Sequence, residues 1–219
     1  MEEFPISIGN KRRGRASSIA VNILLVVLVI IILLELTFFS RFKRFYVVGD
    51  SMYPTLTGAD YYYNSSGERV INSGGDYVYA DTAAQPNRFD IVVITTDNGR
   101  GGETTIIKRA IAFGGETVEL KSGVLYIDGQ LIDEPYAVYN DPDNEYNTYG
   151  PAAVPEGCVF VLGDNRNVSI DSRDHYGMID IDDVVGIVEE WSLNMRWLVT
   201  PFSSFFDFTL PGIFSGCGS

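Results

Sequence analysis

The hydrophobic positions of the chain form one continuous run near the start and many short runs after it. Residues 19–34 read IAVNILLVVLVIIILL, and with their apolar flanks they reach the roughly 20 residues that a bilayer-spanning helix needs. The run is too long for the apolar part of a cleaved signal peptide, and bulky Phe38 and Phe39 follow it. We therefore expect a retained transmembrane anchor over residues 16–40, preceded by a flexible basic tail over residues 1–15.

Beyond the anchor, the short runs are rich in β-branched and aromatic residues and are separated by turn residues. No helical periodicity of any length follows the anchor, so we expect a mostly β domain over residues 41–196. Asp128-Gly129 within residues 124–133 predicts a tight hairpin. The predicted strands are Phe45–Val48, Asp76–Tyr79, Ile91–Thr95, Thr104–Ile111, Thr117–Leu120, Val124–Ile127, Val159–Leu162 and Val184–Glu189.

Three further stretches do not follow a strand pattern. Residues 61–75 and 139–155 are rich in Asn, Gly, Asp and Tyr, which predicts long, mobile loops. Residues 197–219 form an aromatic tail that Pro201 and Pro211 interrupt, so a second membrane span is not expected. The tail lies at the membrane interface or packs on the domain, and both alternatives stay open.

Charge and cysteine content narrow the range of partners. The chain carries 29 acidic and 16 basic residues, a net charge of −13, which argues against a nucleic-acid partner. Basic residues lie on both sides of the anchor, at 11–15 and at 41–44, so the positive-inside rule favours a cytoplasmic N-terminus only weakly. Cys158 and Cys217 lack the spacing of a zinc site, so no metal is expected, and their pairing stays open.

Two polar segments carry candidate chemistry, residues 49–56 (GDSMYPTL) and 105–110 (TIIKRA). Ser51 lies in a tight turn after a strand, where backbone N–H groups can converge as an oxyanion hole requires. Taken alone, a serine in a turn is most often only a turn residue. Lys108 shares a strand face with Ala110. Burial of that face would lower the lysine pKa and provide a general base, whereas an exposed edge would leave the amine charged.

A third polar segment, residues 163–173 (GDNRNVSIDSR), follows a predicted strand. Its acids, arginines and serines predict a charge-assisted network, with a solvated, ion-paired loop as the alternative. In this order after an anchor, the three segments resemble the sequence boxes of bacterial type I signal peptidases, in the Gram-positive-like single-anchor form. The resemblance runs to about Glu189. It implies a mostly β, signal-peptidase/repressor-type catalytic domain without metal or cofactor.

The resemblance also implies a role for individual residues. Ser51 matches the nucleophile of a Ser/Lys dyad, Lys108 the general base, and Ser169 a serine that orients the lysine. Gly49 stands where some relatives carry a serine that donates to the oxyanion, so the hole would depend on backbone N–H, chiefly that of Ser51. A supporting network is implied for the charged residues of the third segment, Asp164, Arg166, Asp171 and Arg173.

The implied function is that of a serine endopeptidase that removes N-terminal signal peptides from secretory preproteins with small residues before the cleavage site. It would be a single-pass protein of the cytoplasmic membrane, in contact with membrane lipid, with its N-terminus inside and its catalytic domain outside. Three alternatives stay open. A triad could use His175, the one histidine. A self-cleaving Ser/Lys regulator would lack the anchor and the acidic charge. A catalytically silent assembly factor would lack Ser51 or Lys108.

Overall fold

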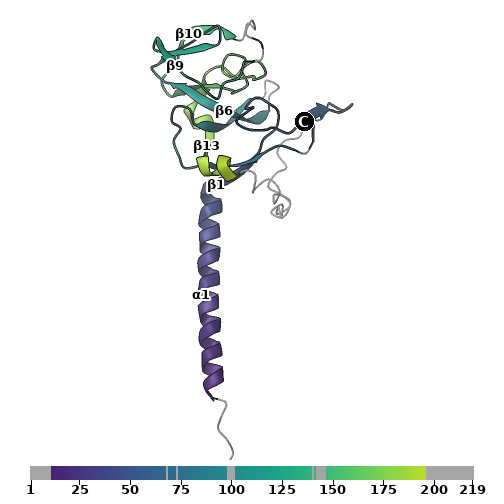
Figure 1. Cartoon of the computed structure of the whole chain (residues 1–219), viewed down its shortest axis with the longest axis vertical. Helices are drawn as coiled ribbons and strands as arrows, with labels where there is room; N and C mark the ends of the chain where they lie inside the picture. The colour runs from purple at the N-terminus through teal and green to yellow at the C-terminus, as the bar shows by residue number, and fades with distance from the viewer. Residues whose placement is uncertain are drawn as a thin grey trace, which may run out of the picture. The chain divides into compact units, whose positions relative to one another are not determined.

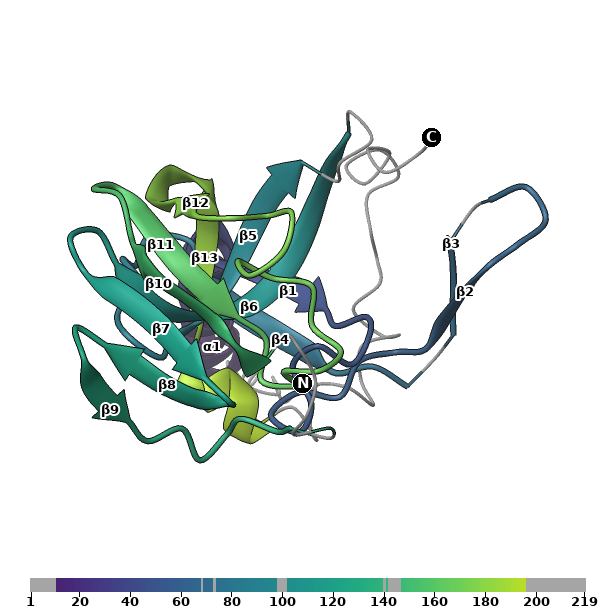
Figure 2. The same cartoon turned by 90° about the horizontal axis from the view of Figure 1, so that it is seen from above.

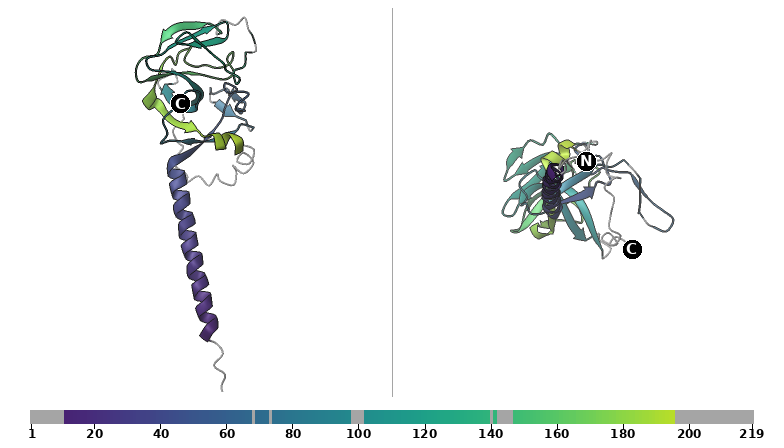
Figure 3. Two further views of the ribbon diagram at one scale, coloured as in Figure 1. Left: turned by 60° about the vertical axis from the view of Figure 1, so that its left-hand side comes forward. Right: turned by 90° about the horizontal axis from the view of Figure 1, so that it is seen from below.

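The computed structural model describes residues 11–67, 69–72, 74–97, 102–139, 141 and 147–195. The chain divides into two compact units, Met1–Arg41 and Phe42–Ser219. The first unit contains helix α1, Lys11–Arg41, drawn as one uninterrupted helix in Figures 1 and 3. Its residues Ser18–Arg41 have a mean hydropathy of 3.2 and are long and apolar enough to cross a membrane.

The helix begins earlier than the sequence predicted. We expected a flexible tail up to residue 15, but residues 11–15 already belong to α1. Lysine and arginine are good helix formers, and Pro5 lies too far upstream to interrupt this turn. Residues 1–10, the remainder of the predicted tail, lie outside the described residues, as does the C-terminal segment 197–219.

The second unit is built from antiparallel strands. Seven of them form one sheet, in the order β1 (Phe42–Tyr46), β4 (Tyr77–Asp81), β13 (Val184–Val188), β5 (Ile91–Asp97), β6 (Glu103–Phe113), β11 (Cys158–Leu162) and β12 (Ile179–Asp180). A four-stranded sheet has the order β10 (Tyr149–Ala153), β7 (Thr117–Lys121), β8 (Val124–Ile127) and β9 (Gln130–Ile132). A short 3-10 helix, η2 (Ile181–Asp183), precedes β13.

The long strand β6 connects the two halves of the domain. Along most of its length it pairs with β5, and its last residues pair with β11. Ile106 and Ala110 pack in one apolar cluster with Val92, whereas Ile107 packs in another. This is the alternation expected around Lys108, which lies opposite Val92 in the sheet.

The predicted strand set is confirmed in outline, and β8 and β9 form the expected hairpin around Asp128-Gly129. Differences occur at three places. The first strand occupies Phe42–Tyr46 and not Phe45–Val48, because the chain pairs with β4 as soon as α1 ends.

The two predicted long loops also contain strands. Residues 61–75 hold an isolated hairpin of β2 (Tyr61–Tyr63) and β3 (Arg69–Ile71), which extends away from the rest of the domain in Figure 2. Residues 139–155 hold β10 at the edge of the small sheet. Pro151 is tolerated in β10 because an edge strand leaves one side of its backbone unpaired.

Candidate active site

The turn that carries Ser51 follows β1 directly. Gly49 has φ +78°, a left-handed conformation that favours glycine, and lets the chain turn towards Ser51. The turn is closed by a backbone hydrogen bond of 2.9 Å from Leu56 N–H to Met52 O. The side chains of Met52 and Leu56 are both buried in the core. Two apolar side chains therefore hold the turn in place and leave the Ser51 hydroxyl free to face the neighbouring strand β6.

Lys108 of β6 approaches Ser51 from that strand. Its Nζ lies 2.9 Å from Ser51 Oγ and 3.1 Å from the carbonyl oxygen of Ile107. The lysine is only 5% exposed. Burial lowers the pKa of Lys108 from 10.5 to about 8, against the opposing effect of the Asp171 and Asp164 carboxylates, which raise it. The sequence alternative of an exposed, fully charged edge lysine is therefore wrong.

The loop after β11 lies directly behind the nucleophile. Its Asn165 N–H donates to the carbonyl oxygen of Ser51 at 3.0 Å. Gly163 begins the loop at a point where no side chain fits, since a Cβ there would stand 2.5 Å from Ser51 O and 2.2 Å from Ser169 Oγ. Ser51, Gly163 and Ser169 are thus packed against one another, although they are far apart in sequence.

Ser169 differs from its expected role. Its side chain is 6% exposed, and its Oγ has no hydrogen-bond partner in the described part of the chain. The expected hydrogen bond from Ser169 to Lys108 is therefore not formed in this arrangement. The hydroxyl is nevertheless buried beside the dyad, and rotation about one side-chain bond changes where it points.

Asp164 of the same loop holds β6 at Arg109 through a buried ion pair. Arg109 donates to Asp164 Oδ1 from Nε at 2.8 Å and to Oδ2 from a terminal nitrogen. Thr55 Oγ1 also donates to Asp164 Oδ2, and the guanidinium lies over the Tyr136 ring at 3.9 Å. Because Arg109 follows Lys108 in β6 and Thr55 lies within the Ser51 turn, one carboxylate connects the two segments that carry the dyad.

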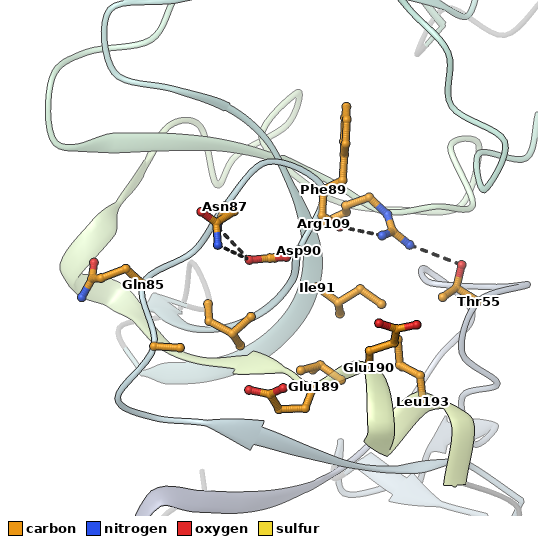
Figure 4. A pocket seen from close by; sticks show the side chains of 13 residues that line it. Thr55, Gln85, Asn87, Phe89, Asp90, Ile91, Arg109, Glu189, Glu190 and Leu193 are labelled. Atoms are coloured by element: carbon orange, nitrogen blue, oxygen red, sulfur yellow. Dashed lines mark hydrogen bonds between the residues drawn. The ribbon is translucent and has the colours of Figure 1, made fainter.

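The other side of Arg109 faces a hollow of about 380 Å³, shown in Figure 4. There the guanidinium donates to the carbonyl oxygen of Phe89 at 2.7 Å and points towards Thr55. Ser51 and Lys108 do not line this hollow. We therefore regard this hollow as part of the surroundings of the Arg109 ion pair and not as a substrate site.

Two more buried ion pairs close the loop 163–173. Arg173 binds both carboxylate oxygens of Asp171 at 2.9 Å, and Asp171 Oδ2 also accepts the Gly163 N–H. Arg166, fully buried, binds both oxygens of Glu134 and donates to the Tyr139 hydroxyl. Each charged residue predicted in this loop therefore has a partner, and the alternative of a solvated, ion-paired loop is wrong.

Comparison with known proteins agrees with this geometry. Residues 18–192 match the family described as signal peptidase, peptidase S26. Signal peptidase I of Bacillus amyloliquefaciens is 37% identical over 180 residues, covering 79% of this chain and 80% of the relative. Signal peptidase I T of Bacillus subtilis (strain 168) gives the same values. The chain belongs to the signal peptidase family.

Among solved structures, a signal peptidase I from Enterococcus faecalis V583 is 34% identical, with a TM-score of 0.40. The match covers 48% of this chain and 98% of that one. Membership of the signal peptidase family confirms the expected mostly β fold and the expected serine endopeptidase that removes signal peptides. The roles of individual residues stay predictions, and the geometry above is what supports them.

Gly49, where we expected no side-chain donor to an oxyanion, has no free backbone donor either. It has no hydroxyl, and its N–H is already donated to the carbonyl oxygen of Ala59 at 2.9 Å. Gly49 therefore supplies no free donor, because the chain segment that follows the nucleophile turn folds back onto it. The N–H of Ser51 has no hydrogen-bond partner among the described residues and is left as the candidate donor.

The sequence analysis did not identify three residues of the buried ion-pair network. Thr55, Arg109 and Glu134 complete the ion pairs but lie in three different segments. Arg109 stood beside the predicted base, and a buried arginine next to an apolar strand requires a carboxylate partner. The sequence did not show which acid pairs with which arginine, because any of these acids could neutralise any of these buried arginines.

His175 lies apart from the dyad. It is exposed and packs on the ring of Tyr176 at 4.2 Å between centroids. The hydrogen-bond partner of Ser51 Oγ is Lys108 and not this histidine. A triad through His175 is therefore not formed. The pairing of Cys158 with Cys217, which the sequence left open, involves a residue outside the described part of the chain, Cys217.

The ion pair of Asp164 provides a stability prediction. Asp164→Asn leaves the Arg109 guanidinium buried, at 8% exposure, without its counter-charge. We expect the free energy of unfolding of the full chain in detergent to fall by about 3–5 kcal/mol, measured by denaturant titration. The matched control Asp182→Asn changes an exposed acid and should stay within about 0.5 kcal/mol of wild type. A loss below about 1 kcal/mol for Asp164→Asn would show that Arg109 is adequately hydrated without it.

Proposed function

We propose that this membrane-anchored signal peptidase cleaves secretory preproteins with a Ser51/Lys108 dyad, after small residues. The observation that carries the proposal is the 2.9 Å contact between Ser51 Oγ and the buried amine of Lys108. An amine whose pKa is about 8 is partly uncharged near neutral pH. Only the uncharged form accepts a proton, so burial of Lys108 is what makes it a base.

The reaction has two stages, formation of an ester on Ser51 and hydrolysis of that ester. Lys108 takes the Ser51 proton while Oγ attacks the scissile carbonyl carbon, and the Ser51 N–H donates to the resulting oxyanion. The lysine ammonium then gives the proton to the leaving amine, which frees the mature protein and leaves the signal peptide as an ester on Ser51. Lys108, uncharged again, takes a proton from water, and the hydroxide attacks the ester. Ser51 regains a proton as the signal peptide leaves as a carboxylic acid.

The preprotein binds as an added strand beside β6. β11 pairs with β6 only at Arg109–Phe113, so the segment Glu103–Lys108 has no partner on that side among the described strands. An extended peptide can form backbone hydrogen bonds to such an edge. The edge ends at Lys108, so a peptide along it reaches Ser51. Met52 and Ile107, the chain neighbours of the two dyad residues, pack in one apolar cluster.

The membrane arrangement follows from the substrate. Signal peptides are presented on the outer side of the cytoplasmic membrane, so the catalytic domain lies outside and the residues before α1 lie inside. Residues 18–41 anchor the chain, and lipid surrounds their exposed apolar side chains. The proposed orientation agrees with the weak preference that the basic residues before the anchor give for a cytoplasmic N-terminus.

The two other functions are less well supported. A repressor-type regulator that cleaves itself has no use for a 24-residue apolar span of hydropathy 3.2. A silent assembly factor has no reason to keep a lysine buried beside a serine hydroxyl, because a buried amine without catalytic use destabilises the fold. Both dyad residues are present and in contact.

Substrate selection provides the test of this proposal. We expect the purified full chain in detergent to cut a preprotein with an Ala-x-Ala site after the second alanine. Replacing that alanine by leucine should lower kcat/KM by about 100-fold or more, because the proposed preference for small residues implies a shallow subsite that a side chain three carbon atoms larger does not fit. The cleavage position is read by mass spectrometry of the products. Equal cleavage of both preproteins would contradict the small-residue preference.

A further inference from the structure

A hollow of about 420 Å³ adjoins the nucleophile turn and is not used by the mechanism above. Its lining consists of Asp50, Tyr53, Thr57, Gly58, Asp60, Gly74 and Asn165. Asp50 immediately precedes Ser51 in the chain, and Asn165 N–H holds the Ser51 carbonyl oxygen. A peptide bound with its scissile bond at Ser51 therefore passes this hollow.

The hollow is built by the start and end of the β2–β3 segment. Ala59 exchanges backbone hydrogen bonds of 2.9 Å with Gly49 and Val47, and Asp76 N–H donates to Thr57 O at 2.8 Å. Gly58 packs so closely that a Cβ there would stand 1.8 Å from Gly49 O. Asp60 is held next to this contact, with its carbonyl oxygen accepting the Asn72 N–H. The position of Asp60 relative to Ser51 is therefore set before substrate binds.

The lining is suited to a positively charged side chain. Asp50 and Asp60 bring two acidic groups, and none of the described lysines and arginines lines the hollow. Arg69 of the hairpin lies over the Tyr61 ring instead, at 5.8 Å. The ring of Tyr53 is 51% exposed at the wall and offers an apolar and cation-attracting face. Asn165, only 5% exposed, also lines the hollow.

The size and position of the hollow indicate which part of the substrate occupies it. The two alanines of the Ala-x-Ala site are small, and a methyl group does not fill 420 Å³. No residue of β6, the edge along which those residues bind, lines the hollow. A long side chain shortly after the bond remains as the occupant.

We infer that this hollow is a specificity pocket for the first or second residue of the mature protein, and that Asp50 and Asp60 select lysine or arginine there. The inference rests on the proposed function, since it assumes a preprotein cleaved at Ser51. A cationic side chain enters between the two carboxylates with its aliphatic part on Tyr53. Glutamate at the same position is repelled. The two partly exposed charge pairs that lysine forms with Asp50 and Asp60 should raise kcat/KM about tenfold over that of a neutral side chain.

The test uses synthetic preprotein peptides with one Ala-x-Ala site that differ only in the first or second residue after it: lysine, glutamine or glutamate. The purified full chain in detergent should cleave them with kcat/KM in the order lysine, glutamine, glutamate at one of the two positions. A peptide with glutamine there and lysine eight residues after the bond has the same charge as the lysine peptide. It should behave like the glutamine peptide, which separates the pocket from attraction to the acidic protein as a whole.

Substitutions locate the effect. Asp60→Asn should bring the ratio of kcat/KM for the lysine peptide to that for the glutamate peptide closer to one. The double variant Asp60→Asn/Asp50→Asn should bring it closer still. The control Asp182→Asn should leave this ratio unchanged. Comparing ratios within one variant removes any effect of the substitution on the dyad. Equal cleavage of the three peptides by wild type, or an unchanged ratio in the double variant, overturns the inference while cleavage of the glutamine peptide still supports the proposed function. Failure of wild type to cut any of the peptides at the site overturns both.

Discussion

Ser51→Ala is expected to lower kcat/KM for preprotein cleavage by about 10⁴-fold or more. The hydroxyl is the group that forms the ester, and an alanine methyl cannot replace it. Removal of a serine nucleophile in a comparable protease costs about 10⁶-fold in kcat, and the remaining rate comes from transition-state contacts that do not need the nucleophile. The measurement is initial-rate cleavage of an Ala-x-Ala preprotein by purified full-length variants in detergent.

The matched control for this prediction is Ser65→Ala. Ser65 is exposed in the turn between β2 and β3, away from the dyad, and its removal should leave kcat/KM within about twofold of wild type. An activity of Ser51→Ala within about tenfold of wild type would mean that another group attacks the carbonyl, and the assignment of Ser51 would be wrong.

Lys108→Met and Lys108→Arg are each expected to lower kcat/KM by about 10³-fold or more. Methionine fills a similar space but carries no base. Arginine keeps the positive charge but does not lose a proton in proteins, so it cannot act as a base either. Because Ser51 and Lys108 act as a unit, the double variant Ser51→Ala/Lys108→Met should be little worse than Ser51→Ala alone. High activity of Lys108→Arg would show that charge, and not proton transfer, is required.

Stability distinguishes a lost base from a misfolded variant. The folded-state pKa of Lys108, about 8, lies below its ordinary 10.5, so the unfolded chain binds more protons between these values. The stability contribution of Lys108 is therefore present above pH 10.5 and is lost as pH falls towards 8. Lys108→Met removes this penalty and should raise the free energy of unfolding at pH 7 by up to about 3 kcal/mol. An inactive variant that is at least as stable as wild type cannot owe its inactivity to unfolding.

Much of the site was readable from the sequence because its parts have local signatures. The Ser51 turn, the apolar strand around Lys108 and the charged loop beginning at Gly163 were each predicted from their own residues. Their order allowed them to be placed together before any distance was known. The burial of Lys108 was not predicted, because the sequence left a buried lysine and an exposed edge lysine both open, and only the structure decides for burial.

The rest depends on tertiary contacts that no local pattern encodes. Arg109 and Asp164 are 55 residues apart, and their pairing follows from the β6–β11 register. The β2–β3 hairpin was taken for a loop because the polar turn between its strands outweighed two short β-prone segments. The loss of Gly49 N–H as a donor arises from Ala59, which reaches it only because the following segment folds back. The same fold-back forms the acidic hollow beside Ser51.

The pH dependence of kcat/KM tests the dyad most directly, because it reports the ionisation of the essential base in the free enzyme. Wild type should gain activity as Lys108 loses its proton, with a midpoint near pH 8 and a plateau above it. His175→Ala should leave that midpoint unchanged. A rate independent of pH between about 7 and 9.5, or a midpoint near the histidine value of about 6.5 that disappears in His175→Ala, would contradict Lys108 as the general base.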